Sequence, residues 1–426
     1  MNITAAQTPE ATAAYLRTLP AIRERCQRVF ELGKEGSLQH FTYHPDRESD
    51  VVKFCIGIIQ RDFGTNYSSI PPHGRWRHFD VEEPRIQPLI DSWKASGTDN
   101  TEIARRVVEL SLVSVLLDAG AGPTWRYKEE RTGKTYGRSE GLAVASLDMY
   151  AAGFFSGKTR DDPWRVDTEG LSRASERNVG AAMQVDSQNA MEGLTGRSAL
   201  LSNLGLALQS STEFFGKDAR AGNIVDFLAK ESKDGHVHVF ALWAALMDGL
   251  AQVWPATRTN FGGRSLGDVW PCPALVSGAG ADSSKGEDLV PFHKLTQWLS
   301  YSLTEPLERI LGWKIDGIED MTGLPEYRNG GLLTDFGVLQ LRILPEDGSI
   351  PQYEPSHPAI VEWRAMTVIL LDRLADAIRK ELNEPGLTTA QILESATWKG
   401  GREIAKQKRS PIGGPPIAII SDGTVF

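Results

Sequence analysis

Residues 324 to 331 (LPEYRNGG) place an acidic and a basic side chain between two apolar stretches. Glu326 and Arg328 lie two positions apart, and the pair Gly330 and Gly331 follows them. Glycine lets a backbone turn tightly or approach a bound molecule closely. The segment is therefore a candidate ligand site, although the same two charges are also typical of a structural ion pair in a turn.

Residues 290 to 294 (VPFHK) open a predicted helix with His293 and Lys294. Unpaired backbone N–H groups at a helix N-terminus, together with a lysine, suit an anion such as phosphate. The alternative interpretation is the solvated start of an ordinary helix. Further polar residues beside glycines and aromatics occur in residues 71–79 (PPHGRWRHF, with His73 and His78), 125–127 (WRY) and 137–141 (GRSEG). The first of these also fits a simple polar loop.

Two nucleotide-binding motifs are incomplete. Gly-Lys-Thr occurs at residues 133–135 and 157–159, but the earlier glycine of a phosphate-binding loop falls on Lys128 in one case and Ala152 in the other. A glycine-rich stretch further on lacks the last glycine of a dinucleotide fingerprint, because Ser283 stands there. We therefore expect no nucleotide cofactor.

Metal ligands are also sparse. His236 and His238 alternate on one face of a predicted strand, yet no third ligand is recognisable nearby. The three cysteines are widely spaced, which fits neither a disulfide framework nor a zinc site: Cys26, Cys55 and Cys272. We expect a site without metal and a reducing compartment.

The composition is that of an ordinary globular protein, with 41% hydrophobic and 24% charged residues. A net charge of −9 argues against a nucleic-acid partner, because binding to phosphate backbones needs concentrated lysine and arginine. The start of the sequence lacks the basic and apolar regions of a signal peptide, and no stretch approaches the roughly 20 apolar residues of a membrane span. These features predict a cytoplasmic protein with no membrane contact.

Helical spacing of apolar residues dominates the sequence, which predicts a mainly α fold with minor β. Helices are expected over residues 9–32 with a kink at Pro20, 100–119, 292–311 and 358–382, and a further one after a capping box at Thr388 and Gln391. Strands are expected at 236–240, 338–344 and 417–420, with a hairpin at 125–136. We expect one compact unit over residues 1–426, or else an N-terminal helical part (1–120) and a catalytic core (121–426).

Several phrases resemble a family of domains of unknown function found in fungi, plants and bacteria and linked to the uracil catabolism pathway. They are IPPHGRWRHF, GRSEGLAVASL, LVPFHKLTQWLSYSL, GLPEYRNGG, HPAIVEWRAMTV and SDGTVF, and the resemblance runs from about residue 10 to Phe426. In that pathway a ring-opened ribosylurea intermediate must release urea. The resemblance implies a small sugar-phosphate or ureido substrate and contact with other enzymes of the pathway.

A second resemblance is to queuosine-nucleotide N-glycosidases, salvage enzymes with a compact fold like that of helical DNA glycosylases. It rests on F-H-K at 292–294, E-Y-R at 326–328 and V-E-W-R at 361–364. Glu326 stands where that family has an aspartate, and another acidic residue of that family falls on Ser302 here. It implies a metal-independent N-glycosidase with a similar helical fold.

The two resemblances together imply roles for individual residues. Cleavage of a ribosyl C–N bond passes through a state like an oxocarbenium ion, so a carboxylate, Glu326, would stabilise the anomeric carbon and activate water. Phosphate would be bound by Lys294 and by Arg328 or Arg126, with His293 as a further candidate. Trp125 and Tyr327 would either wall the ureido group or pack in the core. Glu140 or a histidine would protonate the leaving nitrogen.

Two other functions stay open. One is a non-catalytic partner that binds and channels the ring-opened intermediate. The other is an amidohydrolase that acts on the ureido group itself. The apolar end of the sequence, Phe426, is expected to pack back into the protein. Convergence of Lys294, Glu326, Arg328 and Phe426 on one closed pocket would support the assigned site.

Overall fold

Helices carry most of the chain in the computed structural model, which describes residues 8–255 and 257–420. They are α1 (Pro9–Leu16), α2 (Leu19–Lys34), α3 (Glu48–Phe63), α4 (Trp76–Phe79), α5 (Ile86–Ala95), α6 (Asn100–Leu116), α7 (Arg138–Ala151), α8 (Thr168–Leu171), α9 (Glu176–Ala182), α10 (Leu194–Ser210), α11 (Thr212–Phe215), α12 (Ile224–Glu231), α13 (Val239–Gly249), α14 (Pro273–Ala279), α15 (Lys294–Leu311), α16 (Tyr327–Asp335), α17 (Pro358–Leu382), α18 (Thr389–Ile392) and α19 (Trp398–Lys408). A π-helical turn, η7 (Leu393–Thr397), joins α18 to α19.

Strands are short and pair two by two within the described residues. The antiparallel pairs are β1 (Phe41–Tyr43) with β10 (Leu339–Leu341), β2 (Tyr127–Lys128) with β3 (Thr135–Tyr136), β5 (Asn260–Phe261) with β6 (Arg264–Ser265), and β7 (Val269–Pro271) with β8 (Leu289–Pro291). The parallel pairs are β4 (His236–His238) with β9 (Lys314–Asp316) and β11 (Gln352–Tyr353) with β12 (Ala418–Ile419). The predicted class, mainly α with minor β, is confirmed.

The predicted kinked helix at 9–32 is wrong in detail, because the structure has two helices there, α1 and α2. Thr18 has an extended backbone, and its side chain accepts a hydrogen bond from the N–H of Ala21, which starts α2. Pro20 then occupies the first turn, where a missing N–H is tolerated. The proline therefore begins a helix instead of bending one.

The other predicted helices are present with small changes at their ends. α17 begins at Pro358, and the His357 side chain accepts a hydrogen bond from the N–H of Ala359. Thr388 and Gln391 form the predicted capping box at the start of α18. α15 begins two residues later than predicted, at Lys294, because His293 has a left-handed backbone with φ of 46°.

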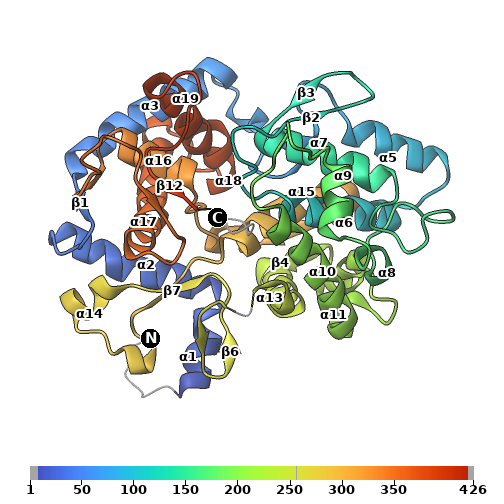
Figure 1. The fold of residues 1–426 in the computed structure, drawn as a ribbon, viewed down its shortest axis with the longest axis horizontal. Helices are drawn as coiled ribbons and strands as arrows, with labels where there is room; N and C mark the ends of the chain where they lie inside the picture. The colour runs from blue at the N-terminus through green and yellow to red at the C-terminus, as the bar shows by residue number, and fades with distance from the viewer. Residues whose placement is uncertain (1–7, 256, 421–426) are drawn as a thin grey trace.

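The helices form two groups (Figure 1). One group contains α2, α3, α16, α17 and α19, with α17 packed along α2 and α16 packed on α19. The other contains α5 to α13, and α6 packs along α15, which runs from the middle of the molecule into this second group. The chain thus brings segments from distant parts of the sequence together at the middle.

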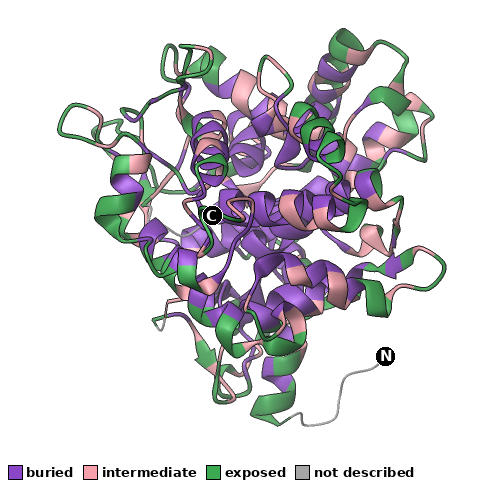
Figure 2. Cartoon of the chain, turned by 90° about the vertical axis from the view of Figure 1, so that its right-hand side faces the viewer, coloured by how far each residue is buried: buried purple, intermediate pink, exposed green. Residues whose placement is uncertain are grey.

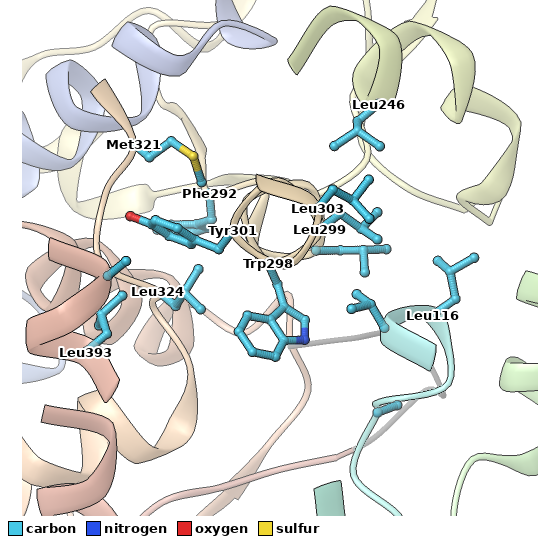
Figure 3. Close-up of a cluster of buried hydrophobic side chains, with 14 of the residues drawn as sticks. Leu116, Leu246, Phe292, Trp298, Leu299, Tyr301, Leu303, Met321, Leu324 and Leu393 are labelled. Carbon is cyan, nitrogen blue, oxygen red and sulfur yellow. The ribbon is translucent and has the colours of Figure 1, made fainter. Parts of the chain in front are cut away.

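The buried side chains follow this arrangement. Figure 2 shows buried segments gathered in the inner helices and exposed segments at the periphery. One hydrophobic cluster runs from Leu19 to Ile417 and includes residues of both helix groups. In Figure 3, α15 is seen nearly end-on, with Leu299 and Leu303 on one side, Tyr301 on another and the Trp298 indole pointing away from both. α15 is therefore the central packing element. Within the described ranges, no helix combines the length and apolarity that crossing a membrane requires.

Candidate functional site

A cavity of about 390 Å³ is lined by residues of both helix groups. This volume lies in the usual range of small-molecule sites. Its charged and polar lining residues are His73, His78, Asp118, Arg138, Ser139, Glu192, Lys294, Glu326, Tyr327, Arg328 and Gln352. Trp298 of α15 and Trp398 of α19 are among the aromatic side chains that complete the wall. Three predicted residues from separate segments, Lys294, Glu326 and Arg328, therefore line one cavity.

Glu326 is the N-cap of α16 and is only 8% exposed. One carboxylate oxygen, Oε2, accepts a hydrogen bond from the Arg328 N–H at 2.7 Å, and Oε1 accepts one from the Asn329 N–H at 2.7 Å. Burial raises the pKa of Glu326, while these two N–H groups and the charge of Lys294 oppose that rise. The carboxyl is thus fixed in position and more basic than an exposed glutamate.

The predicted alternative for Glu326 and Arg328, an ion pair with each other, is not what the structure contains. The Arg328 Nη1 donates instead to the carbonyl oxygen of Gly413 at 2.8 Å. Its guanidinium also lies over the Tyr327 ring, 4.9 Å from the ring centroid. Arg328 therefore ties α16 to the loop that precedes β12.

Lys294 is the first residue of α15 and is only 7% exposed, so the predicted alternative of a solvated helix start is wrong. Burial lowers the pKa of its ammonium group, and the charges of Asp118 and Glu326 oppose that change. Its Nζ makes no hydrogen bond or ion pair with any residue in the described ranges. A buried ammonium group at a cavity wall can bind an anionic or polar group of a ligand.

Asp268, which the sequence did not single out, holds the start of α15 in place. It is fully buried and accepts hydrogen bonds from the Lys294 N–H at 2.9 Å, from Trp270 Nε1 at 2.7 Å and from both terminal nitrogens of Arg364 at 2.7 Å. Burial alone would raise the pKa of Asp268, but Arg364 and these donors hold it well below its usual range.

Arg364 extends this connection to the catalytic candidate. Its Nε donates to the carbonyl oxygen of Pro325 at 3.1 Å, one residue before Glu326. A single buried ion pair, Asp268 with Arg364, therefore fixes the backbone on both sides of the cavity, at Lys294 and at Glu326. Sequence patterns did not reveal this because Asp268 lies far from its partner in the chain and belongs to no local motif.

Arg138 is a second cationic residue that sequence reasoning left without a role, although the segment GRSEG was noted. It begins α7, whose N-cap Gly137 gives no side-chain cap, and it lines the cavity with Ser139. Its Nη2 donates to the carbonyl oxygen of Ile412. Burial and the nearby charge of Arg328 lower its pKa. Two guanidinium groups and a helix N-terminus therefore meet at one edge of the cavity, which favours an anion there.

Asp118 is a second carboxylate of the cavity, just after α6. It forms an ion pair with Nη1 of the fully buried Arg75 at 2.9 Å. Buried Arg197 donates to the carbonyl oxygens on either side of it, those of Leu117 at 3.1 Å and Ala119 at 2.5 Å. The sequence predicted this stretch only as the end of a core helix, since nothing local marks an acid that packing turns toward a cavity.

Four predicted residues are not among those that line the cavity. Trp125 is fully buried and its Nε1 donates to the Met183 carbonyl oxygen at 2.9 Å. Arg126 is exposed and donates to the carbonyl oxygens of Pro123 and its own neighbour Trp125 at 2.9 and 2.7 Å. Both therefore support the chain around the hairpin of β2 and β3.

The other two are His293 and Glu140. The Nε2 of His293 lies 2.8 Å from the Leu16 carbonyl oxygen, and burial lowers its pKa to about 4, so it is a neutral structural residue. Glu140 forms an ion pair with Arg402 of α19. Ser302, the position at which the resemblance to the glycosidases aligned an acid, accepts a hydrogen bond from the Arg75 N–H at 3.2 Å and does not line the cavity either.

His236 and His238 lie on β4 with exposed side chains, and His236 pairs with Asp316 at 2.9 Å. No group of three or more histidine, cysteine, aspartate or glutamate residues is arranged to hold a metal ion in residues 8–255 and 257–420. Phe426, predicted to pack back into the protein, lies outside the described residues.

Comparisons with known proteins agree in covering nearly the whole chain. Residues 15–426 match the family described as "Protein of unknown function (DUF1688)". The chain is 43% identical over 422 residues to "Protein urg3" of Schizosaccharomyces pombe, covering 97% of this chain and 99% of that protein. It is 42% identical over 442 residues to "Uracil catabolism protein 4" of Lachancea kluyveri, covering 98% of this chain and 100% of that protein.

Proposed function

We propose that this chain, which belongs to the family described as "Protein of unknown function (DUF1688)", acts in uracil catabolism and hydrolyses the C–N bond between ribose and urea in a ring-opened intermediate. The pathway is supported by the name of the relative "Uracil catabolism protein 4", which is similar over almost its whole length. The reaction is supported by the residues that line the cavity.

One observation carries the proposal: a buried, immobilised carboxyl with a raised pKa lies in the same small cavity as an unpaired ammonium and two guanidinium groups. Arg138 and Arg328 suit a sugar phosphate because planar guanidinium groups match its oxygens, and Lys294 supplies a third positive charge. Glu326 then faces the sugar as a carboxylate that stabilises positive charge at the anomeric carbon and accepts a proton from the attacking water.

The test measures urea released from ribosylurea and from its 5′-phosphate by the pure protein. Wild-type protein should release urea, and Glu326→Gln should lower the rate by about 10²- to 10³-fold, the usual loss when one electrostatic group of a site is removed. Glu308→Gln is the matched control, because Glu308 lies on the exposed side of α15, outside the cavity lining, and its loss should not change the rate.

Other outcomes identify the alternatives. Ammonia release with ribose still attached would contradict C–N hydrolysis at the sugar and favour an amidohydrolase. Tight binding of the phosphorylated compound without turnover by folded protein would favour a partner that binds and channels the intermediate. A fully active Glu326→Gln protein would remove Glu326 from the mechanism.

A further inference from the structure

Four aromatic rings from three parts of the chain enclose one end of the cavity. His73 lies 4.6 Å from Trp298 and 5.3 Å from Trp398, measured between ring centroids. His78 meets the same two indoles edge to face, at 5.9 and 5.5 Å. All four side chains line the cavity. We call these four residues the ring-lined end.

Two polar atoms of the ring-lined end have no hydrogen-bond partner. They are His78 Nδ1 and Trp298 Nε1, and both are buried in the described structure. A buried polar atom left unpaired is destabilising, so native proteins usually pair such atoms with protein, water or ligand. Burial and the neighbouring charge of Arg75 hold the pKa of His78 well below its usual range, so its ring is neutral. A ligand here therefore meets one N–H donor, from Trp298, and one nitrogen that can accept, from His78.

A planar amide or ureido group matches these two atoms. Its carbonyl oxygen accepts from the Trp298 N–H, its N–H donates to His78, and its flat faces pack against rings. A sugar or a phosphate lacks this flat shape. Arg138 and Arg328 line the same cavity and form its cationic edge, so a molecule with a phosphate at one end and a ureido group at the other can contact both sets of residues.

His73 differs from His78 in its partner. Its Nδ1 lies 2.6 Å from Oε2 of Glu394 on η7, while its Nε2 makes no hydrogen bond within the described ranges. A carboxylate on one ring nitrogen fixes the orientation of the ring and leaves the other nitrogen available to exchange a proton with a ligand. His73 and Glu394 are thus arranged as an acid and the residue that positions it.

We propose that the ring-lined end is the subsite for a planar ureido leaving group and that His73 is the catalytic acid that protonates it. This rests on the proposed function and assigns the acid that the sequence left open. The bond from the anomeric carbon to nitrogen breaks, its electron pair stays on the urea nitrogen, and the Nε2 proton of His73 moves to that nitrogen. Water forms the new C–O bond and gives one proton to Glu326. That proton later passes through solvent to His73, which restores both residues for the next turnover.

The test compares two substrates that share the ribose phosphate part and differ in the leaving group: ribosylurea 5′-phosphate, whose leaving nitrogen needs a proton, and ribosyl fluoride 5-phosphate, whose fluoride leaves without prior protonation. His73→Gln should lower urea release by about 10²- to 10⁴-fold, the usual contribution of a general acid, and lower fluoride release less than about tenfold. Glu394→Gln, which keeps His73, should reproduce this selective loss more weakly. Glu326→Gln should lower both rates.

His236→Gln is the matched control, because His236 has a similar carboxylate partner, Asp316, on the surface. It should leave both rates unchanged. Urea release by His73→Gln within threefold of wild type, or an equal loss of both rates in folded His73→Gln and Glu394→Gln proteins, overturns the acid role.

A failure of the proposed function gives a different result. If wild-type protein releases neither urea nor fluoride, the glycosidase proposal and the acid role both fail, and binding alone decides the subsite. Titration calorimetry should then show that Trp298→Phe weakens the binding of ribosylurea 5′-phosphate by about tenfold, which is the effect of losing one hydrogen bond. The binding of ribose 5-phosphate should not change. Equal weakening of the two ligands, or no change in either, overturns the subsite as well.

Discussion

Glu326 uses one carboxylate in two ways, as a helix cap and as a charged group of a cavity. Capping normally falls to serine, threonine, aspartate or asparagine, whose short side chains reach the N–H groups of the first turn. Here the longer glutamate accepts from two N–H groups, of Arg328 and Asn329, at 2.7 Å each. Because both bonds hold the same carboxylate, the backbone of α16 fixes the position of an otherwise flexible side chain.

The raised pKa of Glu326 predicts a particular pH dependence of stability. Its ordinary value in the unfolded chain is about 4.5, and burial raises it in the folded protein. The folded state therefore binds the proton more tightly, so wild-type stability falls as pH rises from about 4.5 through the raised value. Glu326→Gln lacks this titration, and its free energy of unfolding relative to wild type should improve steadily over that window.

Guanidinium chloride unfolding at a series of pH values measures this difference. The slope with pH is the test, because the constant part also contains the lost capping bond. Glu381→Gln and wild type serve as the reference pair, because Glu381 is an exposed glutamate outside the cavity lining. A difference between Glu326→Gln and wild type that stays flat with pH, or that worsens as pH rises, would show that burial does not raise this pKa.

At the scale of elements, the close approach of α16 and α19 sets the position of Arg328. A Cβ atom on Gly401 of α19 would lie 2.2 Å from the Arg328 carbonyl oxygen, far inside normal contact. Gly401 is therefore required by packing, since only a residue without a side chain lets the two helices meet here. The sequence displayed a Gly400-Gly401 pair but gave no means of knowing which helix it faces.

Gly401→Ala should destabilise the protein by about 1–3 kcal/mol, as overpacking of a tight contact usually does, and should weaken binding of a phosphorylated ligand because Arg328 moves. Gly57→Ala is the matched helical control, since a Cβ at Gly57 of α3 meets no atom within 4 Å. That change should be neutral or stabilise by up to about 1 kcal/mol through helix propensity. Denaturant unfolding of both variants measures the contrast, and equal effects of the two would contradict the packing argument.

At the scale of the whole molecule, the cavity belongs to neither helix group alone. Asp118 and Arg138 come from the group around α6 and α7, while Glu326 and Arg328 come from α16 in the other. A ligand that touches both edges links the two groups. Since binding to the folded state alone stabilises that state by mass action, ligand contacts should be visible in thermal unfolding.

Ribose 5-phosphate should raise the unfolding temperature of the wild-type protein. At a ligand concentration of about one hundred times the dissociation constant, the free energy of unfolding should increase by about 2.7 kcal/mol. Arg138→Met should reduce this rise because it removes a guanidinium group from the cationic edge. Arg126→Met is the matched control, since Arg126 is an exposed arginine that does not line the cavity. The same rise in both variants, measured by thermal unfolding with and without ligand, would remove Arg138 from phosphate binding.

The sequence by itself determined the elements whose signals are local. The apolar stripe of α17, the capping box at Thr388 and the hairpin of β2 and β3 are fixed by neighbours within a few residues, so their patterns could be interpreted directly. The same holds for the segments that carry Lys294, Glu326 and Arg328, because charged residues between glycines and apolar runs stand out in a linear sequence.

Only the tertiary structure decided which of these residues meet. It left His293, Trp125, Arg126 and Glu140 out of the cavity lining and brought in Asp118, Arg138 and the ring-lined end. The physical reason is that burial and charge at a site depend on contacts between helices far apart in sequence. Asp268 and Arg364 lie far apart in the sequence, yet their buried ion pair holds both Lys294 and Glu326 in position. No local pattern encodes that pairing.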